Sequence, residues 1–274
     1  MLLNITPVTN HRGREKGMIV YPVYSRRSAG LSIGINLFTV KKSCLFNCPY
    51  CEVFPFSSGA EFSAEQMEED LRCAVIYAQE QNIPVKDICF SGNGEPSLSP
   101  FFFEALNLAQ KIRKETSPSS QLVVITNGTG LLQKKTFSFL KEASGDPSIN
   151  IWLKLDAGTA QWYQKMNRSQ IPYKKLLKKI KEFTLTAPVT IQTMLCAVES
   201  ENPPAEEETA WENLVCMLAK TGKIRKVQIY GKARAAPEDP LASILPAEYL
   251  EKRAARLRSL LLIEKIITPV EVFL

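Results

Sequence analysis

Short apolar runs alternate with amphipathic stretches through most of the chain, and this alternation limits the possible folds more than any other feature. The predicted strands are Ser32 to Leu37, Asp87 to Ser91, Leu122 to Thr126, Ile149 to Leu155, Val189 to Leu195 and Lys226 to Tyr230. Helices are predicted near residues 63–81, 100–115, 131–143, 173–185, 205–220 and 247–261. Strands that alternate with helices in this way predict a parallel sheet with right-handed crossovers.

The number of these units favours an open barrel. Six strand–helix units are fewer than the eight of a closed barrel. We therefore predict an α/β fold with a partial (β/α)6 TIM-type barrel. At 274 residues, and with no linker long enough to separate a second domain, the chain is expected to form a single domain, 1–274. It would have an amino-terminal arm (1–31), a barrel core (32–235) and a carboxy-terminal helix and tail (236–274).

Composition indicates a cytoplasmic globular protein. Hydrophobic residues make up 45% of the chain and charged residues 23%, which is ordinary for a soluble protein. No apolar run reaches the roughly 18 residues that span a membrane, and the first residues, 1–17, lack a secretory pattern. The chain has seven cysteines, an odd number, and three of them crowd one loop, which favours a metal centre in a reducing compartment over disulfides.

The chain is moderately basic, with a formal net charge of +6. Much of the positive charge lies in two groups: Arg12, Arg14, Lys16, Arg26 and Arg27, and then Lys174, Lys175, Lys178, Lys179 and Lys181. Such groups are compatible with phosphate-rich partners. The alternative is a solvated basic surface, and we prefer it for the lysine run.

Three cysteines fall within eight residues, with the spacing C-x-x-x-C-x-x-C: Cys44, Cys48 and Cys51. Zinc sites and electron-transfer clusters normally use four protein ligands. Three thiolates leave one metal corner vacant, where a small molecule can bind and react. The alternatives are a structural zinc loop or an incidental cluster of cysteines.

This spacing, with the aromatic Tyr50 before the last cysteine, resembles that of the radical S-adenosylmethionine (radical SAM) superfamily. The resemblance implies the six-stranded partial barrel. It also implies a 4Fe–4S cluster on the three cysteines, whose fourth iron is chelated by the amino and carboxylate groups of SAM. Reductive cleavage of SAM then gives methionine and a 5′-deoxyadenosyl radical, which abstracts hydrogen from the substrate. Tyr50 matches a position that packs near adenine; ordinary loop packing is the alternative.

Further candidate residues lie where predicted strands end, because loops after the carboxyl ends of parallel strands form active sites. Residues Gly92, Asn93, Gly94, Glu95 and Pro96 resemble the superfamily's Gly-Glu-Pro element, which contacts the SAM amino group; the alternative is a plain turn. Other candidates for cofactor binding are Asn127, Lys154, Asp156, Gln192 and Arg234.

Three of these candidates have two interpretations each. Lys154 and Asp156 share one face of a strand. They would contact the SAM carboxylate, its ribose or the substrate, or else pair with each other or with the region around Arg168. Arg234 would bind a carboxylate or phosphate, or be an ordinary rim arginine.

A closer resemblance covers residues 20 to 240. The stretch Tyr21 to Arg27, the strand Ser32 to Leu37, the cysteine loop and the element Gly92 to Pro96 resemble small stand-alone radical SAM proteins allied to the tRNA wybutosine-synthesis enzymes. The chain has no flavodoxin-like domain and no extra cysteine-rich element, so the resemblance implies an external electron donor of flavodoxin or ferredoxin type. It suggests a modified nucleobase, a nucleoside or tRNA as substrate. The alternatives are an iron–sulfur electron carrier or a metal-stabilised RNA-binding module.

The other cysteines have no metal spacing. Cys73 and Cys216 lie on apolar helical patterns and are predicted to be core residues, and Cys89 is predicted to pack inside a strand. His11 is the only histidine, which nearly excludes histidine-based chemistry. The run Phe101 to Phe103 is predicted to be packing residues; the alternative is a stacking platform.

Overall fold

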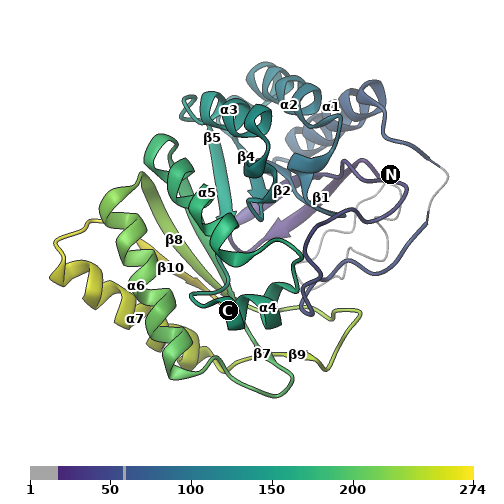
Figure 1. Ribbon diagram of the computed structural model, residues 1–274. Helices are drawn as coiled ribbons and strands as arrows, with labels where there is room; N and C mark the ends of the chain where they lie inside the picture. Colours follow the sequence, from purple (N-terminus) through teal and green to yellow (C-terminus); the bar gives the residue numbers. More distant parts are fainter. Residues whose placement is uncertain (1–17, 58–59) are drawn as a thin grey trace. The chain divides into compact units, whose positions relative to one another are not determined.

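The computed structural model of the protein describes residues 18–57 and 60–274 (Figure 1). His11 and the basic residues Arg12, Arg14 and Lys16 lie outside the described residues. No helix in the described part of the chain is long and apolar enough to cross a lipid bilayer.

The chain divides into two compact units. The first comprises the chain up to Cys44, Val53–Thr126 and Asp146–Asn150, and the second comprises Leu45–Glu52, Asn127–Gly145 and Ile151–Leu274. These boundaries do not follow the predicted arm, core and tail, and the single domain stays a prediction.

The first unit contains four strands in the order β1-β2-β3-β4: β1 (Val20–Ser25), β2 (Gly30–Ile35), β3 (Val85–Phe90) and β4 (Gln121–Thr126). Strands β2, β3 and β4 are parallel, as predicted. We expected an extended or irregular arm over Tyr21 to Arg27; most of this stretch is extended, and it forms β1, whose antiparallel pairing with β2 was not predicted. Pro22 is tolerated in it because β1 is an edge strand.

Two helices pack on the strands of the first unit, α1 (Ala64–Glu80) and α2 (Phe102–Thr116) (Figure 1). The Ser63 hydroxyl accepts a hydrogen bond from the Gln66 amide at 3.2 Å, which confirms the predicted helix start. Phe102 packs edge-on against Phe90 with ring centres 6.1 Å apart, so packing is confirmed for Phe102. Phe101 is 38% exposed and packs against Phe62, with ring centres 5.0 Å apart.

The core prediction is wrong for one cysteine of α1. Cys73 is exposed, whereas Cys89 in β3 is buried as predicted. The buried side of α1 is formed by Met67, Leu71, Val75 and Ala78. Cys73 is two residues from Leu71, about 200° around the helix, and therefore points away from this stripe.

The second unit contains a parallel series in the order β5-β6-β8-β10: β5 (Ile149–Lys154, whose first two residues belong to the first unit), β6 (Val189–Leu195), β8 (Ile224–Gly231) and β10 (Val270–Phe273). Strand β10 was not predicted; it is only four residues long. The two-residue strands β7 (Ala197–Val198) and β9 (Ala242–Ser243) pair with each other.

The helices of the second unit are α3 (Lys134–Ala143), α4 (Ala160–Asn167), α5 (Tyr173–Thr186), α6 (Ala205–Thr221) and α7 (Ala247–Ile263). Four of them were predicted, and α4 was missed. This eight-residue helix begins where the Thr159 hydroxyl accepts from the Trp162 amide. It ends at Asn167 and is followed by Arg168, which has a φ of 43°. The short 3₁₀ helices η2 (Pro96–Leu98) and η3 (Thr129–Leu132) follow β3 and β4.

A buried ion-pair group joins α6 to α7. The Arg253 guanidinium pairs with Glu208 at 2.5 Å and with Glu212 at 3.1 Å, and only 4% of its side chain is exposed. In Arg253→Met, the buried Glu212 carboxylate would retain only one cationic partner, Arg256. We therefore expect this variant to lower the free energy of unfolding by about 3 kcal/mol. Urea denaturation measures this, with the exposed Lys252→Met on the same helix as the control, expected to change it by less than about 0.5 kcal/mol. Equal midpoints for the two variants would contradict the prediction.

Candidate functional site

Ser43, the residue before the first cysteine, is in close contact with the glycine-rich loop after β3. The Ser43 amide donates to the Asn93 carbonyl at 3.2 Å, and the Glu95 amide donates to the Ser43 carbonyl at 2.9 Å. Gly94 has a φ of 158°, and a Cβ atom on it would lie 2.0 Å from the Ser43 carbonyl oxygen. Only glycine therefore allows the backbone before Cys44 to approach this loop so closely.

Hydrogen bonds fix the conformation of the glycine-rich loop. The Glu95 carboxylate is 2% exposed and accepts from the Ser97 amide at 3.2 Å and from the Thr126 hydroxyl at 2.7 Å. The Asn93 amide donates to the Asn36 side chain at 3.1 Å. These contacts anchor a turn next to Ser43.

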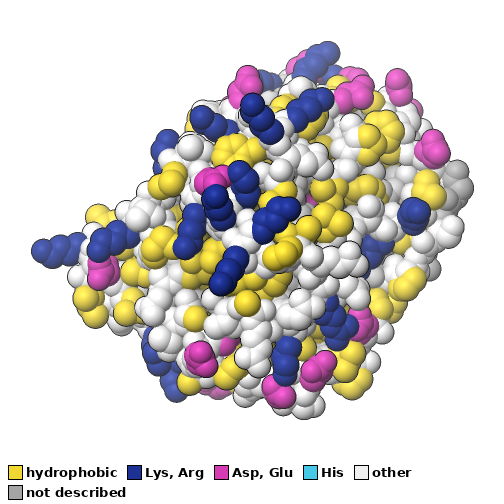
Figure 2. All heavy atoms as spheres, viewed as in Figure 1, with side chains coloured by type: hydrophobic (Ala, Val, Ile, Leu, Met, Phe, Trp, Pro, Cys, Tyr) yellow, Lys and Arg dark blue, Asp and Glu magenta, His cyan; other side chains and the backbone are white. Residues whose placement is uncertain are grey.

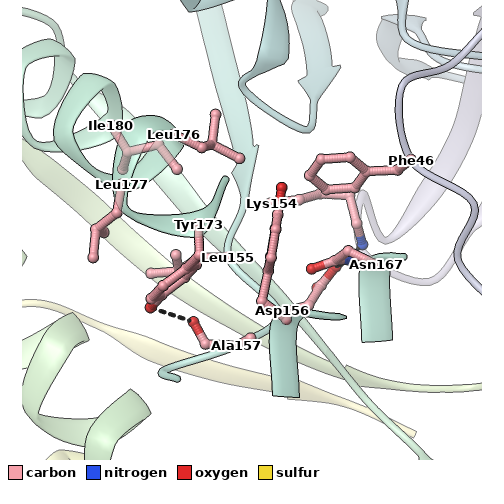
Figure 3. Close-up of a pocket in the computed structure, with 11 residues that line it drawn as sticks. Phe46, Lys154, Leu155, Asp156, Ala157, Asn167, Tyr173, Leu176, Leu177 and Ile180 are labelled. Atoms are coloured by element: carbon pink, nitrogen blue, oxygen red, sulfur yellow. Dashed lines mark hydrogen bonds and ion pairs between the residues drawn. The ribbon is translucent and has the colours of Figure 1, made fainter. Parts of the chain in front are cut away.

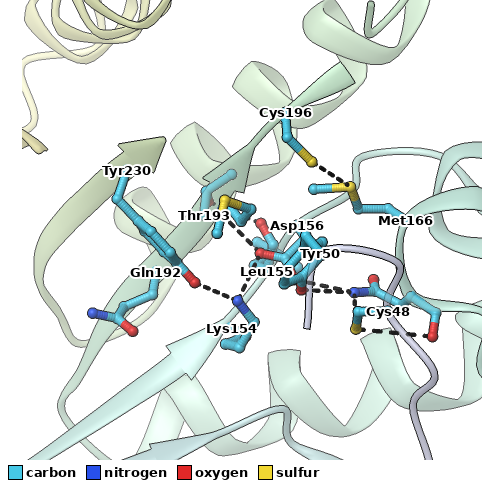
Figure 4. A network of polar contacts seen from close by, with 12 residues as sticks. Cys48, Tyr50, Lys154, Leu155, Asp156, Met166, Gln192, Thr193, Cys196 and Tyr230 are labelled. Carbon is cyan, nitrogen blue, oxygen red and sulfur yellow. Dashed lines mark hydrogen bonds and ion pairs between the residues drawn. The ribbon is translucent and has the colours of Figure 1, made fainter. Parts of the chain in front are cut away.

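The later cysteines lie in the second unit, where Cys48 belongs to a buried polar network (Figure 4). The Asn167 side-chain amide donates to Cys48 Sγ at 3.5 Å, to Asp156 Oδ2 at 3.1 Å and to the Tyr50 hydroxyl at 3.4 Å. The Asn47 amide donates to the Asn167 carbonyl at 2.9 Å. The last residue of α4 thus fixes the cysteine loop through both its side chain and its backbone.

Lys154 and Asp156 form an ion pair at the end of β5, with 3.3 Å between Nζ and Oδ1 (Figure 4). Lys154 Nζ also donates to the Tyr230 hydroxyl at 2.5 Å. The Tyr50 hydroxyl donates to Asp156 Oδ2 at 2.5 Å. Lys154 and Asp156 thus pair with each other, and Arg168 pairs elsewhere, with Glu238; contact of Lys154 and Asp156 with SAM or the substrate stays a prediction.

Burial and the Asp156 carboxylate determine the protonation states of Cys48 and Lys154. Burial, and then the Asp156 charge, raise the pKa of the Cys48 thiol to about 11. Burial would lower the pKa of Lys154, but Asp156 and Tyr230 outweigh it and raise that pKa. At neutral pH, Lys154 is therefore a buried cation and the Cys48 thiol is protonated; a bound metal cation would stabilise the thiolate instead.

The three other candidates take part in separate contacts. Arg234 pairs with Glu52, the residue after Cys51, at 2.9 Å. The Gln192 side chain donates to Gln228 at 2.7 Å inside the sheet. Asn127 Oδ1 accepts from the Thr129 amide at 2.9 Å at the start of η3.

A small cavity of about 10 Å³ borders the network (Figure 3). Lys154, Asp156 and Asn167 line it on one side, and Leu176 and Ile180 of α5 line it on the other. This space admits the centre of about one water molecule. The inner face of α5 therefore lies beside the polar network.

The structure also bears on whether the cysteines suit an iron–sulfur cluster. Cys44, Cys48 and Cys51 form no disulfide within the described residues, and Cys44 is in the first unit while the other two are in the second. Within the described residues, no three His, Cys, Asp or Glu side chains form a group that could hold a metal ion. The donor chemistry fits, because three thiols are available and the Asn167 amide is directed at one sulfur, as hydrogen-bond donors to cluster sulfurs are.

No family model matches the chain. Curated relatives are UPF0026 proteins from two strains of Helicobacter pylori, J99 and 26695, each 29% identical over 191 residues. This match covers 67% of the chain and 56% of each relative. The chain thus spans little more than half the length of these curated relatives.

Many solved structures resemble the chain, and three of them illustrate the likeness. SuiB from Streptococcus suis, bound to S-adenosylmethionine, has a TM-score of 0.64 at 14% identity, over 85% of this chain and 48% of SuiB. A radical SAM methyltransferase from Sphaerobacter thermophilus has a TM-score of 0.62 at 16% identity, over 89% of this chain and 66% of the methyltransferase. TYW1 with a lysine–pyruvate adduct bound has a TM-score of 0.57 at 15% identity, over 83% of this chain and 73% of TYW1. The predicted fold is confirmed: the chain has the partial-barrel fold of radical SAM enzymes.

Proposed function

We propose that the protein is a radical SAM enzyme in which Cys44, Cys48 and Cys51 hold a 4Fe–4S cluster. The observation that carries the proposal is the pairing of two features: a three-cysteine loop that contacts the glycine-rich turn through Ser43, and a fold shared with a radical SAM methyltransferase. When bound, the reduced cluster supplies the electron that cleaves the sulfonium carbon–sulfur bond of SAM.

The residues of the chain have distinct parts in this proposal. The loop from Gly92 to Pro96 receives the amino group of SAM, and its contact with Ser43 fixes its distance from Cys44. Lys154 is a buried cation whose charge attracts the carboxylate of SAM or an anionic group of the substrate, and Asp156 keeps it protonated. Tyr50 packs against the cofactor, and Asn127, Gln192 and Arg234 supply further polar contacts at the strand ends.

The proposed substrate is a modified nucleobase, a nucleoside or tRNA. Its support is the likeness in fold to TYW1, a wybutosine-synthesis protein, together with the basic charge of the chain. We propose that an external flavodoxin or ferredoxin delivers the electron.

Anaerobic reconstitution with iron and sulfide tests the function. The reconstituted protein is expected to bind four irons per chain and, with dithionite, to convert SAM to methionine and 5′-deoxyadenosine. Reconstituted protein that holds iron but forms no 5′-deoxyadenosine with any nucleoside or tRNA added would contradict the proposal.

The Asn167 amide gives a further prediction within this proposal. An N–H donor to a cluster sulfur stabilises the more negative, reduced cluster, so Asn167→Leu is expected to lower the reduction potential by on the order of 60 mV. A redox titration of the reconstituted protein measures this. The control is Met166→Leu, which alters the buried neighbour on α4 and is expected to leave the potential unchanged. Equal shifts in both variants would assign the effect to packing.

A further inference from the structure

Two neighbouring helices of the second unit carry an excess of positive charge that equals the net charge of the whole chain. Helices α3 and α5 contain eight lysines and two glutamates, an excess of six, and the formal net charge is +6. Lys and Arg side chains gather over α3 and α5 in Figure 2, with few acidic side chains among them. The rest of the sequence is therefore balanced, and the positive charge is concentrated at one place.

On α5 the lysines form a continuous stripe. Lys174, Lys178 and Lys181 are exposed and follow the spacing i, i+4, i+7, which places them along one side of the helix over about 10 Å. Lys175 is exposed beside them. Within the described chain, no carboxylate lies within 4 Å of the ammonium groups of these four lysines. Their charges are therefore available to an external partner.

The two helices are fixed to each other by aromatic packing. Phe137 of α3 meets Phe183 of α5 edge-on with ring centres 5.2 Å apart, and Lys179 Nζ lies 5.9 Å from the centre of the Phe137 ring. Lys134 and Lys141 are exposed on α3. The lysines thus belong to a rigid two-helix surface, which we call the lysine face: Lys134, Lys141, Lys174, Lys175, Lys178 and Lys181.

We propose that the lysine face binds the sugar–phosphate backbone of a folded RNA. Lysine is a point-charge ligand for phosphate, and neither helix contains arginine, the commonest reader of base edges. The face is therefore suited to contact phosphates without reading sequence. The choice of RNA over DNA rests on the proposed function.

The same surface is poorly suited to a membrane or to an acidic protein. The apolar side of α5, formed by Leu176, Ile180 and Phe183, is buried in the protein and cannot insert among lipids. Apart from Leu185, which is 54% exposed, α5 presents no large exposed apolar side chain that could anchor a protein partner.

The lysine face lies next to the candidate site. The inner side of α5 lines the cavity that Lys154 and Asp156 also line (Figure 3). The Tyr173 hydroxyl at the start of α5 donates to the Gly158 carbonyl at 2.8 Å. An RNA held on the outer side of α5 would be bound one helix diameter, about 10 Å, from this polar network.

The test compares two triple variants of the full chain in binding to unfractionated tRNA, measured over a range of salt concentrations. K174Q/K178Q/K181Q removes the stripe, and K86Q/K111Q/K252Q removes three exposed lysines elsewhere, so that both variants have the same net charge. The stripe variant is expected to bind at least tenfold more weakly, with the slope of log affinity against log salt reduced by about 2. The control variant is expected to bind like the unaltered protein.

Two further measurements keep the result separate from the proposed chemistry. Cys48→Ala protein, tested without SAM, is expected to bind tRNA as well as the unaltered protein does, so a failure of the enzyme proposal leaves this inference standing. Thermal melts are expected to show that both triple variants are folded. Equal affinities for the two triple variants, or tighter binding to phosphatidylserine vesicles than to tRNA, would overturn the proposal.

Discussion

Replacement of Cys48 by alanine is expected to abolish SAM cleavage, with a fall in 5′-deoxyadenosine formation of at least about 100-fold. The loop has three cysteines, and each would ligate one of three irons in the cluster, so none can be spared. The chain has only one histidine, His11, that could replace a lost thiolate. Iron and sulfide content and the visible absorption of the reconstituted protein should fall together with activity.

The matched control is Cys73→Ala. Cys73 is a free, exposed cysteine on α1, and its removal should leave iron content and 5′-deoxyadenosine formation unchanged. Retained product formation in Cys48→Ala, or equal loss in both variants, would contradict the assignment of the cysteine loop. Far-ultraviolet circular dichroism would confirm that each variant is folded, because Cys48 lies in a partly buried loop.

The alternation of strands and helices could be predicted because most strands are buried runs of apolar residues. Strand β6, Val189–Leu195, is buried at every position, and runs of this kind are typical of parallel sheets. Strand β1 was expected only as an extended or irregular arm, because Pro22 lacks the N–H of a paired strand residue, although an edge position accepts it. Helix α4 was missed because its eight residues give too few turns for a clear apolar period.

The candidate site was predictable where neighbouring residues in the sequence supply its parts. The cysteine spacing and the two glycines at Gly92 and Gly94 are local patterns. Asn167 was not predictable, because its contact with Cys48 joins residues 119 positions apart, and the helix that positions it was itself missed. The pairing of Lys154 with Tyr230 likewise depends on which strands lie close together, which the sequence of either strand does not specify.

The contact between Ser43, next to the cysteine loop, and the glycine-rich loop can be tested by adding one methyl group at Gly94. In Gly94→Ala, the new methyl group would lie 2.0 Å from the Ser43 carbonyl oxygen and 2.8 Å from the Phe38 ring, and the backbone there has a φ of 158°. The loop must move, and the hydrogen bonds between Ser43 and residues Asn93 and Glu95 cannot both persist. We expect the free energy of unfolding to fall by about 3 kcal/mol.

Gly94→Ala should also impair function, because Ser43 adjoins Cys44. Displacement of this backbone separates Cys44 from the loop proposed to receive SAM, so SAM affinity should fall at least about tenfold at temperatures where the variant is folded. The control is Gly145→Ala, whose methyl group would come no closer than 3.1 Å to its nearest neighbour, the Glu142 carbonyl. Urea denaturation and SAM binding by calorimetry measure the two effects. Unchanged SAM affinity in folded Gly94→Ala would show that the glycine-rich turn stabilises the fold without contacting the cofactor.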